Sequence, residues 1–328
     1  MSVDFPQSKT SEHCRTIPHE TGRNGTDGAD SPRKMPGSVT RREFVALSAA
    51  AGSISLLPRM LSGAVNSPKS QMNLGLVTYQ WGRDWDLPTL IDHCEQAEVH
   101  GVELRTQHEH GVEPSLSKSR RRQVRQRFAD SPVELVGYGS NAQFHEPDPE
   151  KVQQNIELTK AYIKLMHDCG GSGVKVKPNG LPKNVPPEKT LRQIGRALNV
   201  VAAFGADYGQ EIRLEVHGRG TSELPNIKRI MDVADHPNVG VCWNCNGTDL
   251  EGDGLESNFK LVQNRLADTV HVRELNVGNY PYAKLMTLLA KMHYAGWILL
   301  ECRTNPSDRI AGLKEQKAVF EKLVAEAG

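Results

Sequence analysis

The sequence predicts a single (β/α)8 barrel, an α/β fold, over residues 71–328, and three observations support this prediction. Short apolar runs alternate eight times with segments of helical periodicity, which is typical of a parallel sheet covered by helices. The stretch has the length of about 250 residues that such a barrel needs. Several of the runs end in ionisable residues, and this barrel places its site at the carboxyl ends of its strands. The rival doubly wound sheet is disfavoured, because no glycine-rich phosphate loop follows the first run.

The expected strands are short apolar runs bounded by turn residues. They lie at 74–79, 102–105, 133–138, 173–177, 212–217, 239–243, 269–273 and 297–301.

The expected helices follow from apolar residues at helical spacing, such as Leu90, Ile91 and Cys94. Gly101 is expected to end the first helix before the second strand. The helix at 117–130 is strongly basic, so we expect it to present a solvated face. The helices are expected at 88–99, 117–130, 148–169, 187–204, 222–234, 255–266, 281–293 and 308–327.

Residues 1–70 are expected to form a disordered tail, because they are rich in Ser, Pro, Gly and charge and lack an apolar period. Within this tail, Arg41 and Arg42 precede a short run of small apolar residues at 46–57, a pattern similar to a twin-arginine signal peptide. The run is too short to span a membrane, and no lipidation cysteine stands at the expected cleavage point after Ala64. We therefore expect a periplasmic or otherwise exported protein, carried by the twin-arginine machinery, without a stable membrane anchor.

Composition restricts the classes of partner. The chain has 40 basic and 39 acidic side chains and a net charge of +1, which indicates no nucleic-acid or membrane-binding surface. Cys242 and Cys245 have the spacing of a zinc pair, but no second pair completes a site, so we expect free thiols. The sequence does not determine the oligomeric state, and a homo-oligomer is compatible with it.

The ionisable residues at the strand ends are expected to share the inner face of the barrel. Successive strand side chains point to opposite faces, so Glu215 and His217 lie opposite Leu214 and Val216. Burying many charges without partners would be costly, so these residues are better explained as one constellation. The same alternation groups Lys175 with Lys177, His271 with Arg273, and sets Glu301 opposite its apolar neighbours.

Five strand motifs resemble those of the xylose-isomerase-like TIM barrels, a superfamily of sugar phosphate isomerases and epimerases, ketose 3-epimerases and hydroxypyruvate isomerases. The motifs read GVELR at 101–105, LEVH at 214–217, VGVCWN at 239–244, HVR at 271–273 and LLE at 299–301. The resemblance covers nearly all of residues 74–328. It implies a divalent metal held by four residues, which are Glu215, Asn244, His271 and Glu301.

Two positions depart from the pattern of the epimerases. Asn244 stands where the family has Asp, which removes one negative charge from the implied metal site. Gly247 stands about where a further His is common. Both departures weaken a direct assignment as a ketose 3-epimerase.

The chemistry of these residue types agrees with the implied site. Oxygen ligands with one imidazole suit Mn²⁺, Mg²⁺ or Co²⁺, and Zn²⁺ also fits. Such an ion can stabilise the enediolate formed when an α-hydroxy ketone loses a proton. Glu215 and Glu301 are the expected catalytic groups, one abstracting the proton and the other returning it. Substrate contacts are expected from His217, Lys175, Lys177, Arg273, Asn246, Glu103 and His145.

Three functions remain open from the sequence. The first is a sugar isomerase or epimerase that acts by proton abstraction next to a carbonyl. The second is a lyase or hydratase on 3-keto-glycosides, and the third is a non-catalytic sugar-binding barrel. Export favours a substrate without a phosphate group. An endonuclease IV-like activity is disfavoured, because the chain has too few His and Asp ligands for a metal cluster and no evident DNA-binding track.

Overall fold

The structure is a computed structural model that describes residues 72–328. The predicted tail, the twin-arginine signal and the expected cleavage point all lie outside the described residues.

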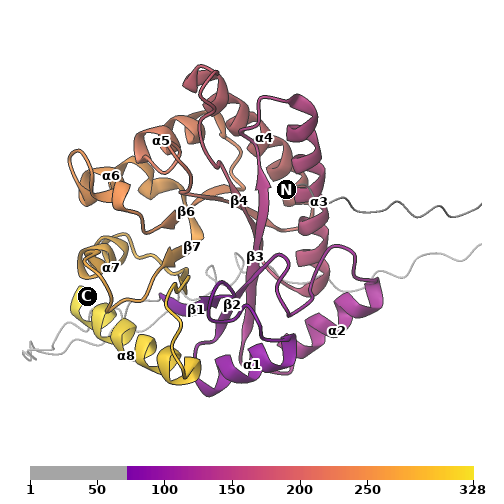
Figure 1. The fold of residues 1–328 in the computed structure, drawn as a ribbon, viewed down its shortest axis with the longest axis vertical. Coiled ribbons are helices and arrows are strands. Elements are labelled where there is room, and N and C mark those ends of the chain that lie inside the picture. Colours follow the sequence, from indigo (N-terminus) through magenta and orange to yellow (C-terminus); the bar gives the residue numbers. More distant parts are fainter. Residues whose placement is uncertain (1–71) are drawn as a thin grey trace, which may run out of the picture. The chain divides into compact units, whose positions relative to one another are not determined.

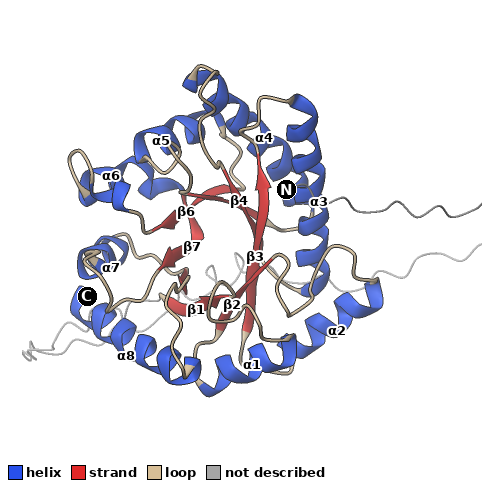
Figure 2. Cartoon of the chain, viewed as in Figure 1, coloured by secondary structure: helices blue, strands red, loops and turns tan. Residues whose placement is uncertain are grey.

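Within residues 72–328 the chain forms a closed barrel of eight parallel strands, surrounded by eight α-helices (Figures 1 and 2). The strands follow one another around the barrel in sequence order, and β8 pairs with β1 to close it. The predicted (β/α)8 barrel is therefore confirmed. The strands are β1 (Asn73–Val77), β2 (Gly101–Arg105), β3 (Glu134–Gln143), β4 (Gly173–Lys177), β5 (Glu211–Glu215), β6 (Val239–Asn244), β7 (Leu266–Val272) and β8 (Trp297–Leu300).

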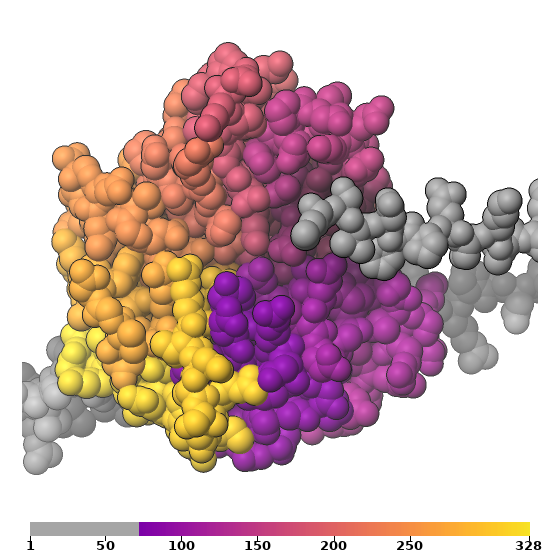
Figure 3. All heavy atoms as spheres, viewed as in Figure 1, coloured from indigo at the N-terminus to yellow at the C-terminus, as the bar shows by residue number. Residues whose placement is uncertain are grey.

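The helices cover the outside of the barrel. They are α1 (Leu87–Gln96), α2 (Lys118–Ala129), α3 (Pro149–Cys169), α4 (Pro187–Asp207), α5 (Leu224–Val233), α6 (Leu255–Val262), α7 (Tyr282–Lys291) and α8 (Arg309–Ala327). Two short 3₁₀ helices, η2 (Gly247–Leu250) and η3 (Gln263–Arg265), flank α6. None of the helices in residues 72–328 has the length and apolar character needed to cross a membrane. Figure 3 shows the indigo and yellow segments side by side, where the last helical unit meets the first.

Several element boundaries differ from those predicted. Strand β3 continues past Tyr138 through a glycine-, serine- and asparagine-containing stretch, because Gln143 still pairs with Lys177 of β4. The segment predicted as one helix at 255–266 ends at Val262 and continues as η3. Strand β7 consequently begins at Leu266, earlier than expected.

The outward side chains of the strands form the main apolar core with the helices. Leu76, Leu104 and Leu214 are fully buried members of this core. A smaller apolar cluster, formed by Val77, Val136 and Leu299, lies apart from it. The five cysteines of the described part are buried free thiols, as predicted.

A buried arginine crosses the interior of the barrel. The Arg213 guanidinium donates to Glu211 Oε2 at 2.7 Å, to the Val136 carbonyl oxygen at 3.0 Å and to Ser172 Oγ at 2.8 Å. A Cβ atom at Gly137 or Gly173 would lie 2.7 Å from the guanidinium, so glycine at these positions makes room for it. Burial disfavours the charged form, but the nearby Glu211 and Glu103 carboxylates outweigh it and raise the pKa of Arg213.

Candidate active site at the barrel mouth

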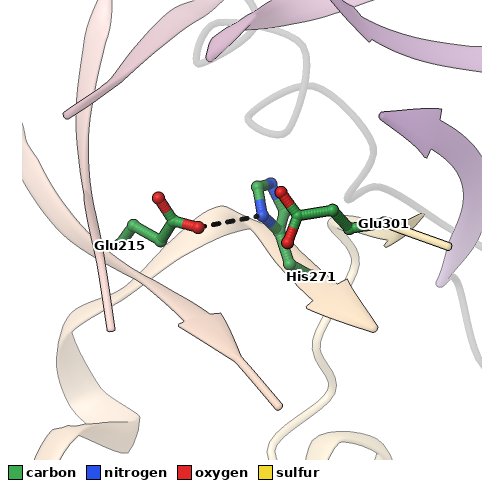
Figure 4. A group of neighbouring side chains, drawn as sticks. All are labelled: Glu215, His271 and Glu301. Atoms are coloured by element: carbon green, nitrogen blue, oxygen red, sulfur yellow. Dashed lines mark ion pairs between the residues drawn. The ribbon is translucent and has the colours of Figure 1, made fainter. Parts of the chain in front are cut away.

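Three side chains from three strands converge inside the barrel. Glu215 ends β5, His271 lies on β7 and Glu301 follows β8 directly. One ligand atom from each lies within 4.8 Å of the other two, and all three residues are buried. Figure 4 shows the two carboxylates on either side of the His271 imidazole. Strand alternation explains this convergence, because it places each of the three side chains on the inner face of the barrel.

This group has the geometry and chemistry to hold a divalent metal ion. Metal–ligand bonds of ~2.0–2.6 Å place two ligands of one ion at most ~4–5 Å apart, which agrees with the observed spacing. His271 Nδ1 is buried, makes no hydrogen bond within the described part of the chain and lies 3.8 Å from Glu215 Oε1, so it is available as a ligand. Two carboxylates and one imidazole suit a borderline or hard divalent cation. The three residues therefore fit a metal site.

Asn244, the fourth expected ligand, lies beside the group but presents its nitrogen. Its Nδ2 donates to Glu215 Oε1 at 3.0 Å, and the residue is buried at the end of β6. An amide nitrogen donates to a carboxylate oxygen at this distance, whereas an amide oxygen would repel it. A half-turn of the amide would present Oδ1 as a ligand.

Lys175 contacts the other oxygen of Glu215. Its Nζ lies 2.5 Å from Glu215 Oε2, and neither side chain is more than 1% exposed. Burial raises the pKa of Glu215, but the Lys175 ammonium and His271 outweigh this effect and hold that pKa well below its usual value. Glu215 is therefore an ionised carboxylate with a partner on each oxygen.

Glu103 lies on the opposite side of the His271 ring from Glu215. Glu103 Oε1 is 3.2 Å from His271 Nε2, whereas His271 Nδ1 is 3.8 Å from Glu215 Oε1. Burial opposes ionisation of Glu103, but His271, Lys175 and Arg213 outweigh it and lower its pKa. Charges of alternating sign thus follow one another through the barrel interior, in the order Glu211, Arg213, Glu103, His271, Glu215 and Lys175.

Arg105 was not among the expected site residues, yet it contacts one of them. Its Nη1 donates to Glu301 Oε1 at 2.8 Å, and its guanidinium lies over the Tyr79 ring at 5.4 Å. Arg105 lies two residues beyond Glu103 on β2, so both side chains share the inner face of the barrel. This alternation could have identified Arg105 as a site residue from the sequence.

Lys177 and His217 lie farther along β4 and beyond β5, respectively. Lys177 Nζ donates to Asn141 Oδ1 at 3.2 Å, and burial together with Lys175 lowers the pKa of Lys177 to about 8. Burial lowers the pKa of His217, whose Nδ1 has no hydrogen-bond partner among the described residues. Both side chains are partly exposed at the strand ends.

The other expected substrate contacts lie outside this group. Asn246 Nδ2 donates to the carbonyl oxygens of Val216 and Asn244 at 2.8 and 2.6 Å, so its side chain fixes the backbone beyond β5 and β6. His145 lines a separate cavity between loops. Arg273 is half-buried and its Nε has no hydrogen-bond partner in the described part, while its backbone nitrogen donates to the Tyr282 hydroxyl at 3.1 Å.

A carboxyl group that the sequence did not suggest is buried behind the β6 loop. Asp249 of η2 accepts from the Asn246 backbone nitrogen at 2.9 Å and from the Tyr280 hydroxyl at 2.7 Å. Burial raises the pKa of Asp249 to about 7. The residue connects the loop after β6 with the segment before α7.

A scan against protein-family models matches residues 91–323 to the family described as xylose isomerase-like TIM barrel. The chain belongs to this family. A search of the curated proteins gave no match.

Solved structures with the same fold include several that act on sugars. An L-ribulose 3-epimerase superposes with a TM-score of 0.68 at 16% identity, covering 78% of this chain and 95% of that chain. A 3-keto-D-glucoside 4-epimerase from E. coli superposes with a TM-score of 0.66 at 14% identity, covering 76% and 99%. The IOLI protein with a bound zinc atom gives 0.66 at 13% identity, covering 78% and 99%. At these identities the likeness shows the fold alone.

Proposed function

We propose that this protein is an isomerase or epimerase that abstracts a proton next to the carbonyl of a non-phosphorylated sugar, with a divalent metal bound by Glu215, His271, Glu301 and Asn244. The observation that carries the proposal is the convergence of Glu215, His271 and Glu301, with ligand atoms within 4.8 Å of one another, at the carboxyl ends of the strands. The family membership and the sugar epimerases among the similar structures support the same reading.

Mn²⁺, Mg²⁺, Co²⁺ or Zn²⁺, when bound, would polarise the sugar carbonyl and stabilise the negative charge left by proton loss. The protein supplies the proton-transfer groups. Glu215 and Glu301 come from β5 and β8, which lie on different sides of the closed barrel. One carboxylate takes the proton from one face of the bound sugar, and the other returns it to the opposite face. Lys177, with a pKa of about 8, is available to donate a hydrogen bond or a proton to a sugar oxygen.

Glu103 acts in this proposal as a positioning residue, in place of the substrate contact expected from the sequence. Both of its oxygens are buried, and Oε1 lies next to His271 Nε2. A carboxylate at this position fixes the ring so that Nδ1 faces Glu215 and a metal. Lys175 acts similarly on Glu215, since the buried ion pair leaves its ammonium no exposed surface.

Two other functions are favoured by specific observations. A lyase on 3-keto-glycosides would begin with the same proton abstraction, and one similar structure is named a 3-keto-D-glucoside epimerase. A non-catalytic sugar-binding barrel is favoured by the state of Glu215, whose two oxygens are already partnered by Lys175 and Asn244.

Metal analysis of the purified protein, followed by assays on free ketoses and on 3-keto-glycosides, tests these functions. The proposal expects about one divalent ion per chain and metal-dependent conversion of a ketose to its isomer or epimer. Elimination products from a 3-keto-glycoside would favour the lyase. Sugar binding without conversion of any substrate would favour the binding module.

We also propose that the chain is exported by the twin-arginine route, on the basis of Arg41 and Arg42 before the small-apolar run. Replacing both arginines with lysine should retain the protein in the cytoplasm. Unchanged export of the double variant would contradict this route.

A further inference from the structure

Glu215, His271 and Glu301 are called the metal-binding group below. A second cavity, separate from this group, opens among the loops that follow β3, β4 and β5. Its volume is about 380 Å³, within the ~300–1,000 Å³ typical of small-molecule sites. The lining residues are His145, Glu146, Pro147, Asn179, Gly180, Leu181, Pro182 and Arg219. The metal-binding group does not contribute to this lining.

The walls of this cavity are held by hydrogen bonds between the loops. The Leu181 backbone nitrogen donates to the Arg219 carbonyl oxygen at 3.2 Å, which joins the loops after β4 and β5. Gln193 of α4 donates to the carbonyl oxygens of Phe144 and Glu146, both at 2.8 Å, which fixes the loop after β3. The cavity is therefore largely preformed, which lowers the entropic cost of binding a ligand.

The close approach of two loops also explains a glycine. Gly218 has a positive φ of 93°, and a Cβ atom there would lie 2.6 Å from the Asn179 backbone. Any larger residue would push the loops after β4 and β5 apart. Glycine at this position therefore allows the two loops to form the wall of the cavity.

The lining suits a neutral, hydroxyl-rich ring better than an anion. Arg219 is exposed, and no carboxylate of the described residues forms an ion pair with its guanidinium. Glu146 contributes a negative charge to the same cavity, which disfavours phosphate. Burial lowers the pKa of His145, which favours its neutral imidazole, and its Nε2 lies 3.8 Å from Glu146 Oε1 in the same cavity. Donors and acceptors of both signs beside apolar walls are what a sugar ring requires.

The cavity adjoins the mouth of the barrel through the chain itself. Asn179 lies two residues beyond Lys177, and Arg219 lies two residues beyond His217. We propose that this cavity binds the second ring of a glycoside, while the ring that carries the carbonyl lies against Lys177, His217 and the metal-binding group. This inference rests on the proposed function and names its substrate class as a disaccharide or a glycoside with a hydroxylated aglycone.

Binding to an inactive protein tests the second-ring site without relying on turnover. In a Glu215→Gln background, calorimetry compares 3-keto-trehalose with methyl 3-keto-α-D-glucopyranoside, which share the keto ring and differ in the second ring. We expect the disaccharide to bind at least about tenfold more tightly. Arg219→Ala should reduce this ratio to within about twofold, whereas Arg122→Ala, at an exposed arginine of α2, should keep it. Leu181→Phe, which fills the cavity, should weaken the disaccharide alone.

Equal affinities for the two sugars, or a ratio unchanged by Arg219→Ala, would overturn the second-ring site. So would binding of inorganic phosphate that competes with the disaccharide and is lost in Arg219→Ala. Exchange of deuterium from solvent into the sugar, measured with the wild-type protein, tests the catalytic proposal separately. Exchange with equal affinities would remove only the second-ring site, a tenfold preference without exchange would remove only the catalytic proposal, and neither binding nor exchange would remove both.

Discussion

The Glu103 carboxylate and the His271 imidazole lie 3.2 Å apart between Oε1 and Nε2, and both side chains are completely inaccessible to solvent. The contact directs the other ring nitrogen, Nδ1, toward Glu215. A carboxylate behind a metal-binding histidine fixes the orientation and the tautomer of the ring. This pair therefore links the packing of the barrel interior to the site at its mouth.

Replacing Glu103 with Gln should weaken metal binding by about 10–100-fold, the usual effect of losing such a carboxylate. Gln keeps the size of the side chain but not the charge that holds His271. Competition titration with a metal indicator measures the change, with Glu134→Gln, an exposed residue at the start of β3, as the control. An affinity equal to that of the wild type would remove the positioning role of Glu103.

Replacing Lys175 with Met should destabilise the metal-free protein by about 3–5 kcal/mol, because it leaves Glu215 as a buried carboxylate without its cation. Added Mn²⁺ should restore more stability to the variant than to the wild type, since the ion supplies the missing positive charge. Denaturant unfolding with and without Mn²⁺ measures both effects. Lys260→Met removes an exposed ion pair with Glu256 and should change stability far less, because solvent screens such pairs. Equal losses with and without the ion would show that Lys175 and a metal do not share Glu215.

Replacing Asn244 with Asp should raise metal affinity by at least about tenfold, because it adds a charged oxygen ligand to the site. The metal-free variant should be less stable than the wild type, since Asn244 Nδ2 now donates to Glu215 and a carboxylate would repel it. Metal titration and unfolding measure the two effects. Asn279→Asp, at an exposed position, provides the control for added charge. Unchanged affinity would place Asn244 outside the metal site.

The pKa of Asp249 predicts a pH dependence of stability. The folded protein raises this pKa from 3.8 to about 7, so the folded state binds the proton more tightly than the unfolded state. The associated stability is complete below pH ~4 and is lost as the pH rises to ~7, by up to ~4 kcal/mol at ~1.4 kcal/mol per pKa unit. Asp249→Asn should therefore gain stability relative to the wild type between pH 4.5 and 7.5.

Urea unfolding at both pH values tests this dependence, with Asp253→Asn at an exposed position as the control. A difference between Asp249→Asn and the wild type that stays constant with pH would contradict the raised pKa.

The sequence predicted the barrel and the central residues because both depend on the alternation of side chains along the strands. This alternation places Glu215, His271 and Glu301 on the inner face, and closure of the barrel brings the carboxyl ends of their strands together. Alternation shows which face a side chain occupies but not how deeply it is buried. Glu103 and Lys175 were therefore expected to touch substrate, although both are fully buried. The Arg105–Glu301 pair joins β2 and β8, which are separated by β1, and only the closed barrel reveals it. Asp249 contacts Asn246 and Tyr280, which lie in loops, and no periodic sequence pattern predicts contacts between loops.

Metal-dependent exchange of deuterium from solvent into a ketose tests the central claim most directly. Glu215→Gln and Glu301→Gln each keep the size and one ligating oxygen but remove a base, so exchange should fall at least ~100-fold in either variant. Glu95→Gln, at an exposed position on α1, should exchange like the wild type. We expect exchange in the metal-loaded wild type and its loss in both Gln variants and after metal removal. Exchange that persists in both Gln variants, or in the metal-stripped protein, would contradict proton abstraction by these carboxylates.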